Sequence, residues 1–162
     1  MLIVDTQTFG YTMLKKAFFS FLISLACLSN AFATDGAAEL NKLLQQYKGN
    51  VVYVDFWASW CGPCRKSFPW MNNMKNKYSE LKVISINVDA NKSLATEFLQ
   101  KVPANFPVIY DPKGVTAKKY KLKGMPSSYI FNKKGQLVSA HVGFTDTKQK
   151  KYELELQTLL AE

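Results

Sequence analysis

Arginine is the scarcest of the charged residues in this chain. Of the 162 residues, 21 are lysine or arginine, and Arg65 is the only arginine. Aromatic residues are not interleaved with the lysines either. Nucleic-acid-binding proteins typically combine a stripe of arginine and lysine with aromatic side chains that stack on bases. The composition therefore argues against a nucleic-acid-binding protein.

The sequence also has no internal repeat, no low-complexity tract and no linker that would separate two domains. A chain of this length has room for one domain with a sizeable core, and hardly for two. We therefore expect a single globular domain, together with whatever targeting segment precedes it.

No apolar run reaches the roughly 20 residues that a bilayer-spanning helix needs. The run at 17–28 is short, follows Lys15 and Lys16, and precedes the small residues of "AFA" at 31–33. A positive segment, a short apolar run and a small-residue cleavage site are the three parts of a secretory signal peptide. The N-terminal pattern therefore predicts export.

We interpret 13–33 as a signal peptide that is cleaved after position 33, leaving 34–162 as the mature domain. Residues 1–12 lack this pattern, and we attribute them to an upstream start codon. Two alternatives remain open. The segment would stay as a membrane anchor if it is not cleaved, or Cys27 would be a lipidation cysteine, although Ser24 stands where a lipidation motif normally has an aliphatic residue.

Cysteine is scarce: the chain has three, and cleavage would remove Cys27 and leave Cys61 and Cys64. A disulfide that closes so short a loop is a poor staple, worth roughly 2 kcal/mol. A structural zinc site needs four ligands, and only His141 could join the two cysteines. A copper site made from these three residues stays open as an alternative, but the pair is better suited to thiol chemistry.

Alternating strand-like and helix-like segments predict a mixed sheet with helices on both faces. The run "VVYVDFW" at 51–57 is apolar on both faces apart from one aspartate, as in a strand that is buried on both sides. The other expected strands are 81–89, 106–111, 127–132 and 136–142, and the expected helices are 37–49, 63–78, 91–101, 113–120 and 147–160. In the last helix, we expect Leu154, Leu156, Leu159 and Leu160 on or near the apolar side.

The two cysteines follow the buried strand at 51–57 and open the next helix. The amide groups at a helix N-terminus carry partial positive charge and stabilise a thiolate, which is the form that attacks disulfides. We therefore expect Cys61 to be the nucleophile. Cys64 lies one helical turn further on and would attack the mixed disulfide to release the product.

Asp55 is the one carboxylate in the buried strand. We expect its side chain to lie beneath the start of the helix and to exchange a proton with Cys64. A structural role, with the carboxylate bound to a backbone amide or a hydroxyl group, is the alternative. Trp57 and Trp60 would supply apolar surface around the site, although Trp57 fits a place in the core equally well.

The segment "DFWASWCGPC" resembles the active-site segment of the thioredoxin superfamily. Further along, "GMPSS" (124–128) resembles that superfamily's cis-proline loop, and "HVGF" (141–144) its short glycine loop. The three motifs occur in the family's order over residues 38–160. The resemblance implies a thioredoxin-like α/β fold and thiol:disulfide oxidoreductase activity.

The resemblance also implies roles for particular residues. Met125–Pro126 would be a cis peptide bond, and Met125 would offer its backbone to an extended peptide; in another context Pro126 would be an ordinary turn residue. Gly143 would line the same groove. On the opposite side the groove would be bordered by three residues that surround the first cysteine, Trp60, Gly62 and Pro63.

The segment 91–111 is extra material compared with a minimal thioredoxin, and "DPKG" follows it. A helix-strand insertion before the cis-proline, combined with an export signal, resembles the TlpA-like thiol:disulfide reductases. A second departure concerns Ser85, which stands where minimal thioredoxins carry a buried lysine. Any proton relay through Asp55 therefore lacks that partner.

Gly62-Pro63 is the dipeptide of the reducing members of the superfamily, whereas strong oxidants carry a histidine there. We therefore predict a reductant, with an oxidant or isomerase as the alternative. The resemblance implies exported disulfide substrates, apocytochrome c among them, and electrons from a membrane protein of the DsbD or CcdA kind. No cofactor beyond the dithiol is expected, and we expect a monomer. A peptide clamp without redox turnover and a copper chaperone stay open.

The chain is basic, with a formal net charge of +9. Eight lysines fall between Lys101 and Lys134. Such a cluster would attract an acidic partner or an anionic membrane surface. The plainer interpretation is the solvated face of an exported protein.

Overall fold

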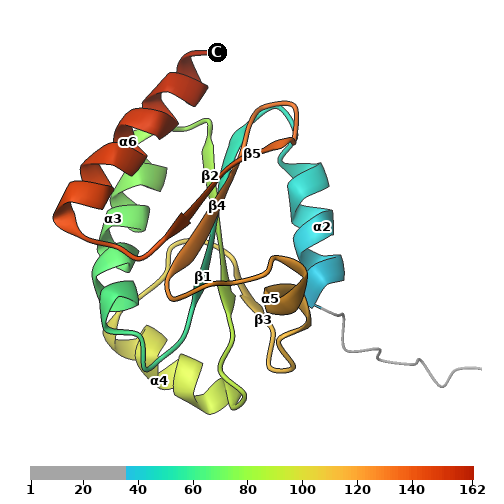
Figure 1. Ribbon diagram of the computed structural model, residues 1–162, viewed down its shortest axis with the longest axis vertical. Coiled ribbons are helices and arrows are strands. Elements are labelled where there is room, and N and C mark those ends of the chain that lie inside the picture. Colours follow the sequence, from blue (N-terminus) through green and yellow to red (C-terminus); the bar gives the residue numbers. More distant parts are fainter. Residues whose placement is uncertain (1–35) are drawn as a thin grey trace, which may run out of the picture. The chain divides into compact units, whose positions relative to one another are not determined.

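The computed structural model describes residues 36–162, which form a five-stranded mixed sheet with helices on both faces (Figure 1). The predicted signal peptide and start site at 1–33 lie outside the described residues. The strand order is β3-β2-β1-β4-β5. The strands are β1 (Val51–Trp57), β2 (Leu81–Asn87), β3 (Val108–Tyr110), β4 (Ser127–Phe131) and β5 (Leu137–Val142).

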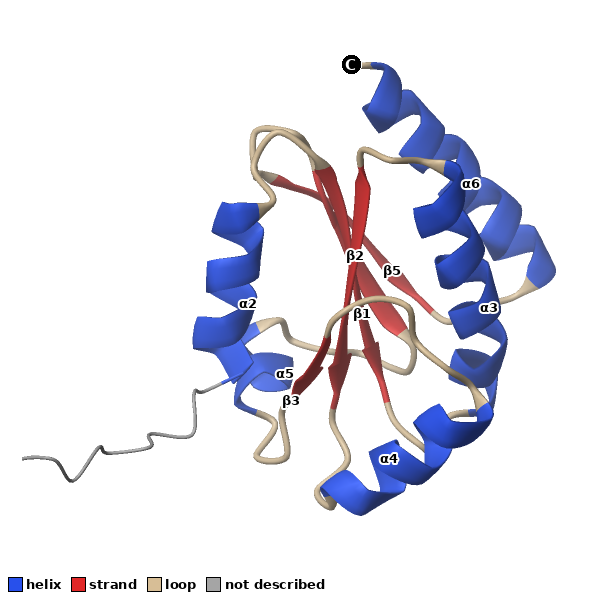
Figure 2. Cartoon of the chain, turned by 180° about the vertical axis from the view of Figure 1, so that it is seen from behind, coloured by secondary structure: helices blue, strands red, loops and turns tan. Residues whose placement is uncertain are grey.

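The described residues also contain five helices. They are α2 (Gly36–Gln46), α3 (Gly62–Lys77), α4 (Lys92–Lys101), α5 (Val115–Lys119) and α6 (Asp146–Ala161). Figure 2 shows α2 and α5 on one face of the sheet and α3 and α6 on the other. Within residues 36–162, no helix combines the length and the apolar character that crossing a membrane requires.

The central strand β1 is buried along its whole length. It runs parallel to β2 and antiparallel to β4. Because successive side chains of a strand point to opposite faces, Tyr53 and Trp57 join the core under α3, α4 and α6. Val54 and Phe56 join the second core, under α2 and α5. This two-sided burial explains the nearly continuous apolar run in the sequence.

The predicted insertion is present as α4 and β3. Strand β3 extends the sheet by pairing in parallel with β2, and Phe98 of α4 packs against Trp57 and Phe68. The insertion therefore contributes aromatic side chains to the core beside the helix that carries the cysteines. The expected thioredoxin-like architecture is confirmed.

Most element bounds differ from the prediction by one or two residues, but one side chain was misplaced. Leu154 was expected near the apolar side of the last helix, and its exposed fraction is 64%. Tyr152 and Leu156 are the buried residues of α6. Leu154 lies two residues from each of them, and at 100° per residue this places it on the opposite side of the helix. Leu156 is buried as predicted, and Leu159 and Leu160 pack partly against the core.

Candidate functional site

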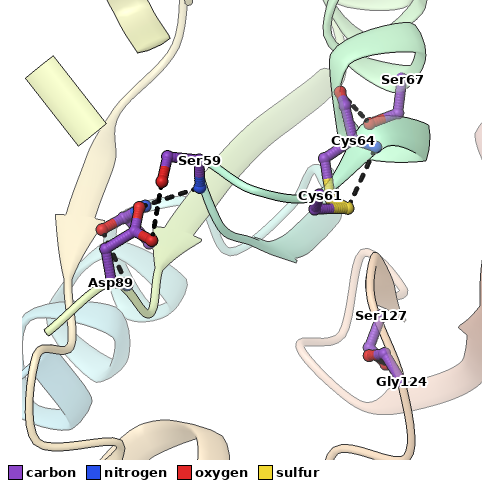
Figure 3. The surroundings of a disulfide bond; sticks show 8 residues. Ser59, Cys61, Cys64, Ser67, Asp89, Gly124 and Ser127 are labelled. Carbon is purple, nitrogen blue, oxygen red and sulfur yellow. Dashed lines mark hydrogen bonds between the residues drawn. A yellow bond between two sulfur atoms is a disulfide. The ribbon is translucent and has the colours of Figure 1, made fainter. Parts of the chain in front are cut away.

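A disulfide joins Cys61 and Cys64 at the beginning of α3, with 5.3 Å between their Cα atoms (Figure 3). Cys61 is the N-cap residue of the helix, and its Sγ atom accepts a hydrogen bond from the backbone N–H of Cys64 at 3.2 Å. Gly62 and Pro63, both exposed, form the first helical turn between them. Proline suits this position because the first amides of a helix have no intrahelical partner.

The start of α3 favours negative charge on the Cys61 sulfur once the disulfide is reduced. The N-terminal amides point toward it, and the first turn of the helix holds no acidic residue. Arg65 and Lys66 follow directly and are exposed. The sulfur that caps the helix is therefore the one best placed to be a thiolate.

Both cysteines are buried, Cys64 more completely than Cys61. The exposed fraction is 3% for Cys61 and 0% for Cys64. Trp60, immediately before the pair, is 71% exposed and stands beside the disulfide as a large apolar surface residue. Cys61 therefore lies slightly nearer the surface than Cys64, which agrees with the expected order of attack.

The second wall of the site is the loop that leads into β4. Met125–Pro126 is a cis peptide bond, and Met125 packs against the core cluster that contains both cysteines. Pro126 is buried. Ser127 caps the loop, because its hydroxyl group donates to the carbonyl oxygen of Gly124 at 2.7 Å (Figure 3).

Gly143 ties this loop to the end of β5. Its N–H donates to the carbonyl oxygen of Pro126 at 2.7 Å. Its φ of +80° lies in the left-handed region that favours glycine. Gly143 thus lies next to the cis-proline, as the motif predicted.

Sequence reasoning missed the residue that holds Gly143 from the other side. The hydroxyl group of Tyr152 in α6 donates to the carbonyl oxygen of Gly143 at 3.0 Å. The Tyr152 ring stacks on His141, with 4.3 Å between the centroids, and the Nε2 atom of His141 lies 2.7 Å from an oxygen of Glu155. The only available signal was the spacing of Tyr152 four residues before Leu156, which marks a core position and does not reveal a hydrogen bond.

Asp55 lies in the middle of β1, opposite Ser85 of β2 and Ser128 of β4. Ser85 is the residue that stands where minimal thioredoxins carry a buried lysine, and the strand pairing places it directly beside Asp55. The exposed fraction of Asp55 is 1%, and neither of its carboxyl oxygens has a hydrogen-bond partner among the described residues. The described residues therefore give no support to the alternative of a structurally hydrogen-bonded Asp55.

Burial raises the pKa of Asp55 well above its ordinary value of 3.8. Burial, and after it the charge of Asp55, raises the pKa of both Tyr53 and Tyr152. A carboxyl group that keeps its proton to higher pH in a dry core can accept and return a proton nearer neutrality. This is the property that the proton-transfer role requires.

Trp57 is a core residue. It is fully buried, and its ring packs against Phe68 and Phe98 with centroid separations of 4.9 and 4.6 Å. Of the two tryptophans predicted to flank the site, Trp60 alone presents surface to a partner. The core interpretation of Trp57 is confirmed.

A second buried aspartate, Asp89, holds the loop before the cysteines, and no sequence motif marked it. Its two carboxyl oxygens accept from the N–H and the hydroxyl group of Ser59, at 2.9 and 3.0 Å (Figure 3). Asn87 donates to the same carboxylate at 2.7 Å. The signal was its place just after a parallel strand, at the sheet edge where the cysteine loop also begins.

In the part of the chain that the structure describes, no three histidine, cysteine, aspartate or glutamate residues gather in a way that could hold a metal ion. The Nε2 atom of His141 is instead engaged with Glu155. The geometry therefore does not favour the copper site that the sequence left open.

The sequence matches the model of the Redoxin family over residues 28–156. The thioredoxin-like protein YneN of Bacillus subtilis is 32% identical over 117 residues, which span 70% of this chain and 68% of that protein. The thiol-disulfide oxidoreductase ResA of Bacillus cereus is 32% identical over 114 residues, which span 69% of this chain and 64% of ResA. The aligned stretch thus covers about two thirds of each of these relatives.

Two solved structures share the fold. A Chlorobium tepidum protein provisionally named thiol:disulfide interchange protein DsbE is 46% identical, with a TM-score of 0.70 over 72% of this chain and 84% of that one. The exposed lipoprotein thioredoxin Etrx1 of Streptococcus pneumoniae is 28% identical, with a TM-score of 0.62 over 72% of this chain and 90% of that one.

Fold and site together define a thioredoxin-like thiol-disulfide oxidoreductase with the cysteine pair Cys61–Cys64. The chain belongs to the Redoxin family of the thioredoxin superfamily.

The raised pKa of Asp55 predicts a pH-dependent effect of Asp55→Asn on stability. In the unfolded chain the carboxyl group ionises near its ordinary pKa, whereas the folded protein keeps it protonated to higher pH. Between the two pKa values only the unfolded chain ionises, so the free energy of unfolding falls by up to about 1.4 kcal/mol per pH unit. Asparagine cannot ionise, so the substitution should stabilise the oxidised protein increasingly as pH rises.

Urea unfolding of the oxidised protein at about pH 4 and about pH 8 measures this difference. Glu97→Gln, which removes an exposed carboxylate from α4, is the matched control and should show no such growth with pH. A change in the free energy of unfolding that is equal at both pH values for Asp55→Asn would contradict the account.

Proposed function

We propose that this protein is an exported reductase that reduces disulfides in other exported proteins through Cys61 and Cys64. The observation that carries the proposal is the position of Cys61: its sulfur caps α3, and it follows the exposed Trp60 and precedes the exposed Gly62 and Pro63. The cis-proline loop packs against the same cluster. A thiolate held there attacks an extended chain laid along the loop.

The reaction has two steps and moves two electrons from the protein to its substrate. The Cys61 thiolate attacks one substrate sulfur, so that a mixed disulfide forms and the other substrate sulfur leaves as a thiolate. Cys64 then gives its proton to Asp55 and attacks the Cys61 sulfur. The second substrate sulfur is released, and the protein is left with the Cys61–Cys64 disulfide.

The proposed substrate groove has one wall on each side of Cys61. Trp60, Gly62 and Pro63 form one wall and are exposed. Met125 and Pro126, with Gly143 behind them, form the other. In this arrangement, the backbone of Met125 pairs with the substrate backbone, and Trp60 covers an apolar side chain next to the substrate cysteine.

The proposed direction of electron flow rests on Gly62-Pro63. A histidine between the cysteines stabilises the reduced form and makes an oxidant, and this chain has none there. The relatives named ResA and DsbE are a thiol-disulfide oxidoreductase and a thiol:disulfide interchange protein. Both names are compatible with a reductant.

We place the protein outside the cytoplasm, because the pattern at 13–33 is that of a cleaved signal peptide. Etrx1 is described as an exposed lipoprotein. In an oxidising compartment a reductant needs an outside source of electrons, and a membrane protein of the DsbD or CcdA kind would supply them. The resemblance to TlpA-like reductases supports apocytochrome c, with its Cys-x-x-Cys-His motif, as one substrate.

Insulin reduction in the presence of dithiothreitol tests turnover directly. The wild type should accelerate precipitation of the insulin B chain, and Cys61→Ser should reduce the rate to that of dithiothreitol alone, because the attacking thiolate is absent. Cys64→Ser should instead accumulate a mixed disulfide that mass spectrometry detects. A wild type no faster than Cys61→Ser would favour the peptide clamp without redox turnover.

A second kinetic prediction concerns Asp55. Asp55→Asn should slow the resolution of the mixed disulfide by about 100-fold, the lower end of general acid–base effects. It should leave the first attack by Cys61 largely unchanged, because the helix N-terminus, and not Asp55, stabilises the Cys61 thiolate. Stopped-flow measurement of both steps separates them, and an unchanged resolution rate would remove Asp55 from the mechanism.

A further inference from the structure

The segment from 112 to 145 contains seven lysines and no aspartate or glutamate. Five of these lysines belong to α5 and the loops on either side of it, and all five are exposed: Lys113, Lys118, Lys119, Lys121 and Lys123. None of the five forms an ion pair in residues 36–162. Within the described part of the chain, no ion pair therefore neutralises their charge.

The neighbouring elements offer little negative charge to balance them. Helix α2 packs on α5 and has one acidic residue, Glu39, which pairs with none of the lysines. Asp111, which precedes the segment, is buried and accepts a hydrogen bond from the N–H of Ala117. The lysines thus present an uncompensated positive surface.

This surface adjoins the proposed substrate groove. Lys123 directly precedes Gly124, the first residue of the cis-proline loop. Lys121 has a φ of 53°, in the left-handed region that lysine rarely adopts. The turn at Lys121 is closed by the bond from its N–H to the carbonyl oxygen of Lys118 at 3.0 Å.

The other side of the groove is positive as well. Arg65 and Lys66 are exposed in the first turns of α3, and the sequence of that helix contains no acidic residue. The two aspartates that serve the site, Asp55 and Asp89, are buried. We call Arg65, Lys66, Lys121 and Lys123 the basic rim.

We propose that the basic rim selects polypeptide partners that carry acidic residues next to their reactive cysteines. Opposite charges around a groove speed diffusional encounter and disfavour partners of the wrong sign. An anionic membrane is the less suitable occupant, because a bilayer resting on the rim would cover Cys61 and block the site. The inference rests on the proposed function and names the chemistry of its substrates.

Two disulfide-bonded peptides test the inference, identical except that glutamates flank the cysteines of one and lysines those of the other. The reduced protein should react roughly tenfold faster with the acidic peptide at low salt. Each rate is normalised by dividing it by the rate with uncharged hydroxyethyl disulfide, which corrects for differences in the intrinsic reactivity of the thiols. At an ionic strength of about 0.5 M the preference should shrink, because the charges are screened.

The double variant Lys121→Glu/Lys123→Glu should lose or invert the preference for the acidic peptide. The matched control is Lys48→Glu/Lys134→Glu, with the same change in net charge. Both of its lysines are exposed near the β4–β5 turn, where the N–H of Gly49 donates to the carbonyl oxygen of Lys133. This control should keep the wild-type preference.

Equal normalised rates with the two peptides, or an equal loss of preference in both double variants, would overturn the inference while leaving the proposed function intact. Reaction with none of the three disulfides would instead refute the proposed function. Binding to vesicles of anionic lipid that is lost in Lys121→Glu/Lys123→Glu, without discrimination between the peptides, would assign the rim to a membrane and also overturn the inference.

Discussion

The burial of β1 on both faces is the constraint on which the site depends. Because β1 is the central strand and fully buried, its end is held in one place, and the chain leaves it only four residues before α3 begins. The position of Cys61 is thereby set by the core and not by a free loop. The antiparallel pairing of β4 with β1 brings the loop of Pro126 to the same end of the sheet.

Two buried aspartates serve this arrangement in opposite ways. Asp89 accepts hydrogen bonds from Ser59 and Asn87, so its carboxylate is well satisfied and keeps the cysteine loop in place. Asp55 has no such partner in the described chain, and burial raises its pKa. A satisfied carboxylate rigidifies its surroundings, whereas a buried carboxyl group with a raised pKa has the property that the proposed proton transfer requires.

Local patterns predicted much of this structure. Three elements could be predicted from their own segments alone. The apolar run predicted β1, and proline after the first cysteine predicted the start of α3. The helical spacing of Leu40, Leu43 and Leu44 predicted α2. The resemblance to minimal thioredoxins singled out Ser85, and the structure places it opposite Asp55. The motif order then placed the cis-proline loop and Gly143.

What the sequence could not show depends on contacts between distant segments. The bond from Tyr152 to Gly143 depends on how α6 lies across the sheet, and no local pattern encodes it. The same is true of the bonds from Ser59 to Asp89, thirty residues apart. Leu154 was misplaced because a helix with apolar residues on several sides does not reveal which side faces the core.

The central claim is that the Cys61–Cys64 pair exchanges bonds with disulfides of partner proteins and gives them electrons. Its most direct test is the reduction potential of the pair, measured by equilibration of the purified protein with glutathione redox buffers and quantified from the fraction oxidised. The account predicts a value below roughly −240 mV, near that of a reducing thioredoxin. A value above about −150 mV, in the range of a strong oxidant, would contradict it.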